Sequence, residues 1–193
     1  MTQMRRPMRK LLALAAVLAC TAQAPAPQPA PSPLPWCGTV PLPQPDLPQL
    51  NLDGTSIHRP RAQDCRALDV QAGSHTLRLA VAATEAQRQH GLMNVPFVPA
   101  GQGMLFAFSG GDGQRYFWMK DTIAPLDMVF VKNDGVISQI SANVPATKPG
   151  TPDDKLARRD GIARYVIELG AGDAARLGLT PGMRLIVPPV SGE

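Results

Sequence analysis

The sequence predicts one mainly β domain, a small barrel or sandwich of about seven short strands with one or two short helices. Apolar side chains alternate with polar or small ones in several segments, as Leu77, Leu79 and Val81 do, which is typical of strands with one buried face. Turn sequences rich in glycine separate these segments. Among them, Asn133-Asp134-Gly135 between two apolar runs is the strongest hairpin signal.

The expected elements follow one another at short intervals. Strands are predicted over residues 68–71, 76–83, 103–108, 115–119, 126–131, 136–140, 164–169 and 183–187. The first two form a hairpin around residues 72–74, and residues 110–113 turn the chain back from the third strand into the fourth. A long polar loop with three prolines is expected at 144–161, and a helical turn at 172–177.

A short helix is predicted between the second and third strands. Thr84 can cap its first turn through the side-chain hydroxyl, and Gln87, three residues later, can return the bond in a capping box. Gly91 is placed to end the helix, because glycine tolerates the left-handed backbone that often follows a last turn.

The first 19 residues have the three-part form of a signal peptide. A basic region with Arg5, Arg6, Arg9 and Lys10 leads into the apolar run 11–19. That run is too short to span a bilayer, which takes about 20 apolar residues. The sequence therefore predicts export to the periplasmic or outer-surface side of a membrane.

Cys20 is the expected site of a lipid anchor. Val17-Leu18-Ala19-Cys20 resembles the lipobox of bacterial lipoproteins, in which the cysteine is acylated and becomes the new N-terminus. A second interpretation is ordinary cleavage after Ala22-Gln23-Ala24, although Pro25 would then follow the scissile bond. The N-terminal lipid is the only membrane contact that the sequence predicts.

The charge of the exported part does not suit nucleic acids. The whole chain has a net charge of +4 and an isoelectric point near 9.3. The four basic residues of the signal peptide account for all of that excess, so removing them leaves a net charge of zero. A balanced charge with few aromatic residues offers little to a phosphate backbone, and no nucleic-acid partner is expected.

Residues 20–66 are expected to form a proline-rich tether ahead of a single globular domain at 67–193. More than half of the 21 prolines lie at or before residue 60, and proline alternating with small residues favours an extended chain. Cys37 and Cys65 remain once Cys20 carries lipid, and in an oxidising compartment they can form a disulfide. The alternative is two unpaired thiols in the tether.

The candidate ligand site is the segment from Trp118 to Asp127. Lys120, Asp121, Thr122 and Asp127 place a cation, two carboxylates and a hydroxyl beside the large aromatic ring of Trp118. A flat apolar face with a few directed hydrogen bonds suits a sugar or another small polar ligand. We therefore expect a binding or accessory module of the cell envelope, with a small molecule or an envelope polymer as its partner.

Two other interpretations of this segment stay open. Asp121 and Asp127 could be the general acid and base of a small hydrolase of envelope polymers, if their carboxyl groups lie about 5–10 Å apart. In a purely structural envelope protein, the same side chains would cap a turn, pair Lys120 with Asp127 and fill the core. A binding module instead needs Trp118 or Tyr116 exposed at a concave surface.

No metal or cofactor site is predicted. His58, His75 and His90 share no ligand-like spacing, and the chain has no Cys-x-x-Cys. The chain also has neither the motif of a phosphate-binding loop nor the glycine-rich motif that binds dinucleotides.

Four groups of residues together resemble the bacterial and archaeal "domain of unknown function 192" family. They are Gly91-Leu92-Met93, Gly103-Met104-Leu105-Phe106, Phe117-Trp118-Met119-Lys120-Asp121-Thr122 with Pro125-Leu126-Asp127, and Tyr165-Val166-Ile167-Glu168-Leu169. The resemblance spans about Leu77 to Val187 and implies a compact, mainly β domain, often behind a signal peptide. It implies no reaction. The sequence departs from the family pattern in two places: Asp121 stands where the family usually has asparagine, and Asn94-Val95 replace a stretch that commonly ends in arginine.

Overall fold

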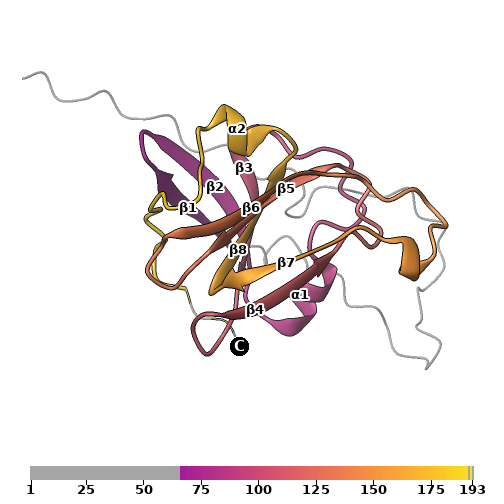
Figure 1. Ribbon diagram of the computed structural model, residues 1–193, viewed down its shortest axis with the longest axis horizontal. Coiled ribbons are helices and arrows are strands. Elements are labelled where there is room, and N and C mark those ends of the chain that lie inside the picture. Colours follow the sequence, from indigo (N-terminus) through magenta and orange to yellow (C-terminus); the bar gives the residue numbers. More distant parts are fainter. Residues whose placement is uncertain (1–65, 191, 193) are drawn as a thin grey trace, which may run out of the picture. The chain divides into compact units, whose positions relative to one another are not determined.

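A six-stranded sheet with the strand order β1-β2-β3-β8-β5-β6 is the framework of the computed structural model (Figure 1). The structure describes residues 66–190 and 192. The predicted signal peptide at 1–19, nearly all of the tether, the lipid site Cys20 and the pair Cys37 and Cys65 lie outside the described residues.

The described part holds eight strands and two short α-helices. The strands are β1 (Ala67–Ala72), β2 (His75–Ala82), β3 (Gln102–Ala107), β4 (Gly113–Trp118), β5 (Leu126–Val131), β6 (Ile137–Val144), β7 (Arg158–Ala163) and β8 (Tyr165–Gly170). The helices are α1 (Glu85–His90) and α2 (Asp173–Arg176), with a 3-10 turn, η2, at Asp153–Lys155. Neither helix of this part is long and apolar enough to cross a bilayer. The prediction of a mainly β fold is confirmed, but the sheet does not close into a barrel and is compatible with a sandwich.

Two of the three predicted hairpins form, and so does the predicted helix cap. β1 pairs with β2 and β5 pairs with β6, each antiparallel across its glycine-containing turn. Gly135 in the second turn has φ +83°, a left-handed conformation that glycine adopts without steric cost. Thr84 and Gln87 make both bonds of the capping box at the start of α1. These features depend on neighbours in the sequence, which explains why the sequence shows them.

β4 and β7 form a separate two-stranded ribbon, which the sequence did not predict. The strand after the 110–113 turn was expected to return along its predecessor, but β3 pairs with β8 instead. The expected loop at 144–161 is wrong at its end, because β7 begins at Arg158. Ile162 is the one large apolar side chain of β7 and is half exposed, so no alternating pattern marks this strand.

The expected last strand at 183–187 is also wrong, because the segment is shared between the two edges of the sheet. Ile186 exchanges two backbone hydrogen bonds with Gln71 on β1, of 3.1 and 2.9 Å. Near the start of β6, the amide of Ile137 donates to the carbonyl of Met183, and Val136 bridges Arg184. A segment that divides its bonds between two edges cannot build a ladder with either.

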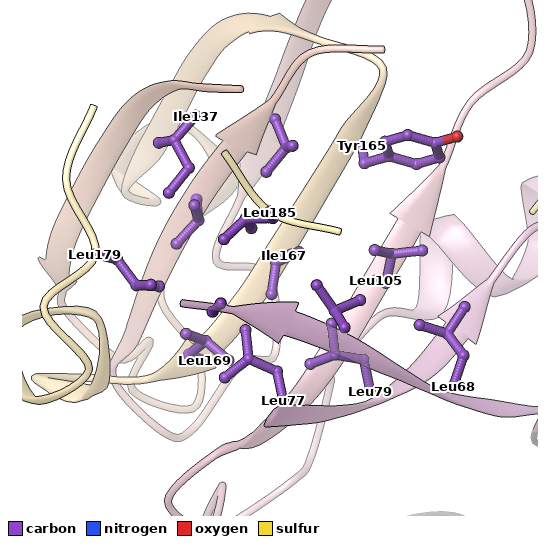
Figure 2. Close-up of a cluster of buried hydrophobic side chains, with 14 of the residues drawn as sticks. Leu68, Leu77, Leu79, Leu105, Ile137, Tyr165, Ile167, Leu169, Leu179 and Leu185 are labelled. Carbon is purple, nitrogen blue, oxygen red and sulfur yellow. The ribbon is translucent and has the colours of Figure 1, made fainter. Parts of the chain in front are cut away.

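Two apolar clusters cover the two faces of the sheet. Figure 2 shows the first, where Leu77 and Leu79 of β2 lie near Ile167 and Leu169 of β8, and Leu185 covers them from the C-terminal segment. The second gathers on the opposite face beneath the β4–β7 ribbon; it includes Phe106, Met128, Phe130 and Val166. Because β5 and β8 are covered on both sides, nearly every side chain in these two strands is buried.

Candidate functional site

A pocket of about 180 Å³ opens on the face of the sheet that carries the second cluster. One wall is α1 and the residues that follow it, and another is β4, which lies close to α1 in Figure 1. The lining also includes Phe106 of β3, Glu168 of β8, and Lys120 and Thr122 from the turn after β4. The site thus stands on strand and helix ends, which hold side chains more precisely than free loops do.

The aromatic wall of the pocket is set by the alternation of β4. Phe117 points inward and meets Phe106 edge-on with ring centroids 4.9 Å apart, and it contacts Phe130 in the same way at 6.2 Å. Its neighbours Tyr116 and Trp118 point the other way, and their side chains are 79% and 41% exposed. Two rings therefore stay accessible at the rim while the ring between them anchors the strand.

Both cations of the lining already have carboxylate partners. Arg88 Nη2 lies 3.0 Å from Glu85 Oε2, and its Nη1 donates to the carbonyl of Ala107 at 2.9 Å. Lys120 Nζ lies 3.1 Å from Asp153 Oδ2 and 5.1 Å from the ring centroid of Trp118. Little positive charge in the pocket is left without a counter-charge.

Three of the five predicted site residues, Trp118, Lys120 and Thr122, line the pocket. The hydroxyl of Thr122 donates to the carbonyl of Lys120 at 3.0 Å, so this side chain also fixes the turn. The bond of Thr122 is local to the turn, but it goes to a backbone carbonyl and not to an amide. Trp118 is 41% exposed and is not a core residue.

Asp121 is exposed and is not part of the pocket lining. Its backbone has φ +49°, and its carbonyl accepts a 2.8 Å bond from the amide of Asn94. Asparagine and aspartate adopt this left-handed conformation more readily than most residues. The backbone therefore gives a physical reason for an Asn or Asp at this position, without a ligand.

Asp127 lies on the opposite face of the sheet and is fully buried. Its Oδ1 accepts a 2.8 Å bond from the amide of Asn143, and its Oδ2 accepts a 2.9 Å bond from the amide of Ala174. Lys120 pairs with Asp153, so the expected ion pair with Asp127 does not form. Asp121 is exposed, Asp127 is fully buried, and neither lines this pocket, so the two-carboxylate arrangement of a hydrolase finds no support in it.

Glu168 also lines the pocket and is not among the predicted site residues. Its side chain is 5% exposed, and burial raises the pKa of its carboxyl to about 8. The sequence does carry a signal for it, because Glu168 is the single charge in the apolar run from Tyr165 to Leu169. Charged residues are almost never fully buried without a partner or a function.

The pocket offers no cluster of metal ligands. Among residues 66–190 and 192, no group of three or more His, Cys, Asp and Glu side chains could hold an ion. His90 is the one histidine of the lining.

Comparisons with known proteins agree with this fold but establish no activity for this chain. Residues 68–187 match the family DUF192, which is described as "Uncharacterized ACR". One similar solved structure comes from Sinorhizobium meliloti 1021 and is provisionally described as a transcription regulator. It is 36% identical in sequence, and the match covers 61% of this chain and 88% of the S. meliloti chain, with a TM-score of 0.50. A protein of unknown function from Novosphingobium aromaticivorans DSM 12444 is 27% identical, with a TM-score of 0.54. That match covers 73% of this chain and 93% of the other. No curated protein matches.

The match to the family extends from β1 to the C-terminal segment, so it includes every element that builds the pocket. It also confirms the resemblance predicted from the motifs around Gly91, Trp118 and Glu168. This chain belongs to the DUF192 family.

Proposed function

We propose that this protein is an exported, lipid-anchored component of the cell envelope whose β domain binds a small ligand, with carbohydrate the favoured class. The observation that carries the proposal is the pair of accessible rings, Tyr116 and Trp118, at the rim of a pocket that also holds polar side chains. Sugars bind to proteins through this combination of an apolar stacking face and directed hydrogen bonds.

The rigidity of the aromatic wall supports the same proposal. β4 is held on one side by the ladder to β7 and on the other by Phe117, whose ring is fixed among Phe106, Phe108 and Phe130. Exposing two large rings costs solvation free energy that a purely structural protein would avoid by burying them. A preorganised surface binds a ligand with little further loss of conformational entropy.

The charge of this domain does not suggest DNA binding, the activity that a transcription regulator such as the S. meliloti protein would need. Residues 67–193 contain twelve Lys and Arg and twelve Asp and Glu. A DNA-binding domain usually carries a clear excess of positive charge that neutralises phosphates. We therefore favour a small ligand over nucleic acid.

Replacement of Trp118 by alanine tests the binding proposal. A thermal-shift screen of the full chain against envelope sugars, peptides and metals should show a shift, since a ligand at 100 times its Kd adds about 2.7 kcal/mol to the free energy of unfolding. The Trp118→Ala variant should lose the shift and keep its own folding. Phe97→Ala is the matched control, because Phe97 is 69% exposed and lies outside the pocket. A Trp118→Ala protein that still binds would refute the site.

The lipid anchor has an independent test. Labelled fatty acid should attach to the wild-type chain in a bacterial host and not to Cys20→Ser. Equal labelling of both chains, or of neither, would contradict the anchor without affecting the ligand site.

A further inference from the structure

Glu168 stands at an unusual place in the pocket, in the middle of a central strand of the sheet. In the register of β8, its neighbours are Met104 on β3 and Met128 on β5, so uncharged side chains flank it on both sides. It lines the pocket although the residue is only 5% exposed. Its carboxyl group is thus buried in the protein but adjacent to the space that a ligand would fill.

The carboxyl of Glu168 has no hydrogen-bonding or ionic partner among the residues that the structure describes. Burial alone raises its pKa to about 8, without a contribution from a nearby charge. The group therefore keeps its proton at neutral pH. A buried polar group that has no partner in the protein is expected to find one in a bound molecule.

The other titratable groups of the lining do not supply that partner. Glu85, Arg88 and His90 come from α1, and Tyr116 and Lys120 come from β4 and the turn after it. Arg88 and Lys120 are the cations, and each is engaged by its own carboxylate. β3 and β5 present only apolar side chains beside Glu168.

We propose that the pocket selects an uncharged, hydroxyl-bearing ring, and that Glu168 in its acid form is the residue that sets this specificity. A protonated carboxyl has one O–H donor and a carbonyl acceptor, which matches a hydroxyl group that both accepts and donates. This inference rests on the proposed function, because it names the ligand class of the same site.

Charged ligands of either sign fit the pocket less well. A carboxylate buried beside Glu168 would lack a counter-charge, since the two cations are already paired, and a buried unpaired charge is costly. An ammonium group would require Glu168 to ionise, which its surroundings disfavour. A hydroxyl needs neither charge nor counter-charge.

The size of the pocket agrees with a single ring. A volume of about 180 Å³ slightly exceeds the cavity of about 150 Å³ that holds one benzene molecule in an engineered protein. Tyr116 and Trp118 also belong to the lining, on the side of the pocket that β4 forms.

The experiment compares ligands that differ at one substituent, which is either neutral, a carboxylate or an ammonium group. Glucose, galactose and mannose would each be titrated calorimetrically against the full chain at pH 6, together with the matching uronic acid and 2-amino sugar. For at least one of the three sugars we expect the neutral form to bind at least tenfold more tightly than either charged form.

Variants of Glu168 supply the second arm of the experiment. Wild-type affinity for the neutral sugar should fall about tenfold per pH unit above pH 8, because an ionised carboxyl cannot donate. Glu168→Gln has an N–H donor group and a carbonyl acceptor at every pH, so its affinity should stay constant from pH 6 to pH 9.5. Glu168→Leu fills the same space without polar atoms and should lose binding at every pH.

The outcomes separate the two proposals. Absence of binding by every sugar at pH 6 would overturn the carbohydrate function, and this inference would fall with it. Tighter binding of a uronic acid or amino sugar would overturn the inference alone. Wild-type affinity that is unchanged up to pH 9.5, while Trp118→Ala abolishes binding, would also overturn the inference about Glu168 and leave the binding function standing.

Discussion

Two buried carboxyl groups in neighbouring strands, Asp127 of β5 and Glu168 of β8, have opposite surroundings. Leu169 is the cross-strand partner of Asp127, and Met128 is that of Glu168, so the two side chains lie on opposite faces of the sheet. Asp127 accepts hydrogen bonds from two backbone amides, whereas Glu168 has no partner within the described chain. The comparison teaches that burial of an acid does not indicate function by itself. Its hydrogen bonds decide whether it is part of the architecture or free for a ligand.

The partners of Asp127 explain why an acid is placed there. The pairing of β5 with β6 shifts register between Leu126 and Met128, and the amide of Asn143 in this irregular stretch bonds to Asp127. Helix α2 begins without a side-chain cap of its own, and Asp127 accepts a bond from the amide of Ala174 in its first turn. One carboxylate thus satisfies backbone groups from two elements that the sheet ladder cannot reach.

The largest expected difference between the two acids is in the pH dependence of stability. The pKa of Glu168 is about 8 in the folded protein, against an ordinary value of 4.5, so the folded state binds the proton more tightly than the unfolded state. Its contribution is fully present below pH 4.5 and is lost as the pH rises through 8. The loss is on the order of 5 kcal/mol in the free energy of unfolding.

Urea denaturation of the wild type and Glu168→Gln between pH 4.5 and pH 9 measures this effect. The difference in free energy of unfolding between the two chains should grow with pH in favour of the glutamine variant. Parallel curves over the whole range would mean that Glu168 is solvated or paired, and would remove the contrast with Asp127.

Removal of the Asp127 carboxylate should have the next largest effect. Asp127→Ala leaves the amides of Asn143 and Ala174 without their acceptor, and we expect a loss of about 2–4 kcal/mol at pH 7. Asp121→Asn is the matched control, because Asp121 is exposed in a left-handed conformation that asparagine also adopts. Its stability in urea should stay within about 0.5 kcal/mol of the wild type.

A small effect of Asp127→Ala would show that water or a shifted backbone replaces the carboxylate. Ligand binding by the folded fraction of this variant should remain, since Asp127 lies across the sheet from the pocket. Loss of binding at full stability would instead place Asp127 in the site.

The sequence predicted the parts of the molecule that depend on local residues. The hairpin at Asn133-Asp134-Gly135 and the capping box at Thr84 each need only a few adjacent side chains. The ribbon escaped prediction because β7 pairs with a strand more than forty residues earlier in the chain and shows almost no apolar alternation. Such a strand is specified by what it packs against.

The site was predictable to a similar degree. Trp118, Lys120 and Thr122 form one continuous motif and do line the pocket. Asp127 belongs to the same motif, but its position in β5 turns its side chain to the other face. Glu168 lies 46 residues beyond Thr122. Only the pairing of β3, β8 and β5 brings Glu168 to the same pocket, although its charge in an apolar strand could have drawn attention to it.

The ribbon that carries the aromatic wall is held close to the sheet by Gly161, and this contact gives the smallest of the expected effects. A Cβ atom at this position would lie 2.8 Å from the ring of Phe130, which is fully buried and cannot move aside. Gly161→Ala should therefore lower the free energy of unfolding by about 1–3 kcal/mol, the usual cost of an overpacked core.

Gly113→Ala on the same ribbon is the matched control for Gly161→Ala, because its Cβ would meet only the flexible end of Arg115 at 3.4 Å. Its stability should be unchanged, or raised by about 0.4–1 kcal/mol through the loss of backbone freedom in the unfolded chain. Equal urea midpoints for the two variants would mean that the ribbon does not pack tightly against Phe130. In that case the position of Trp118 in the pocket lining would have to be set by the turn at Thr122 rather than by close packing on the sheet.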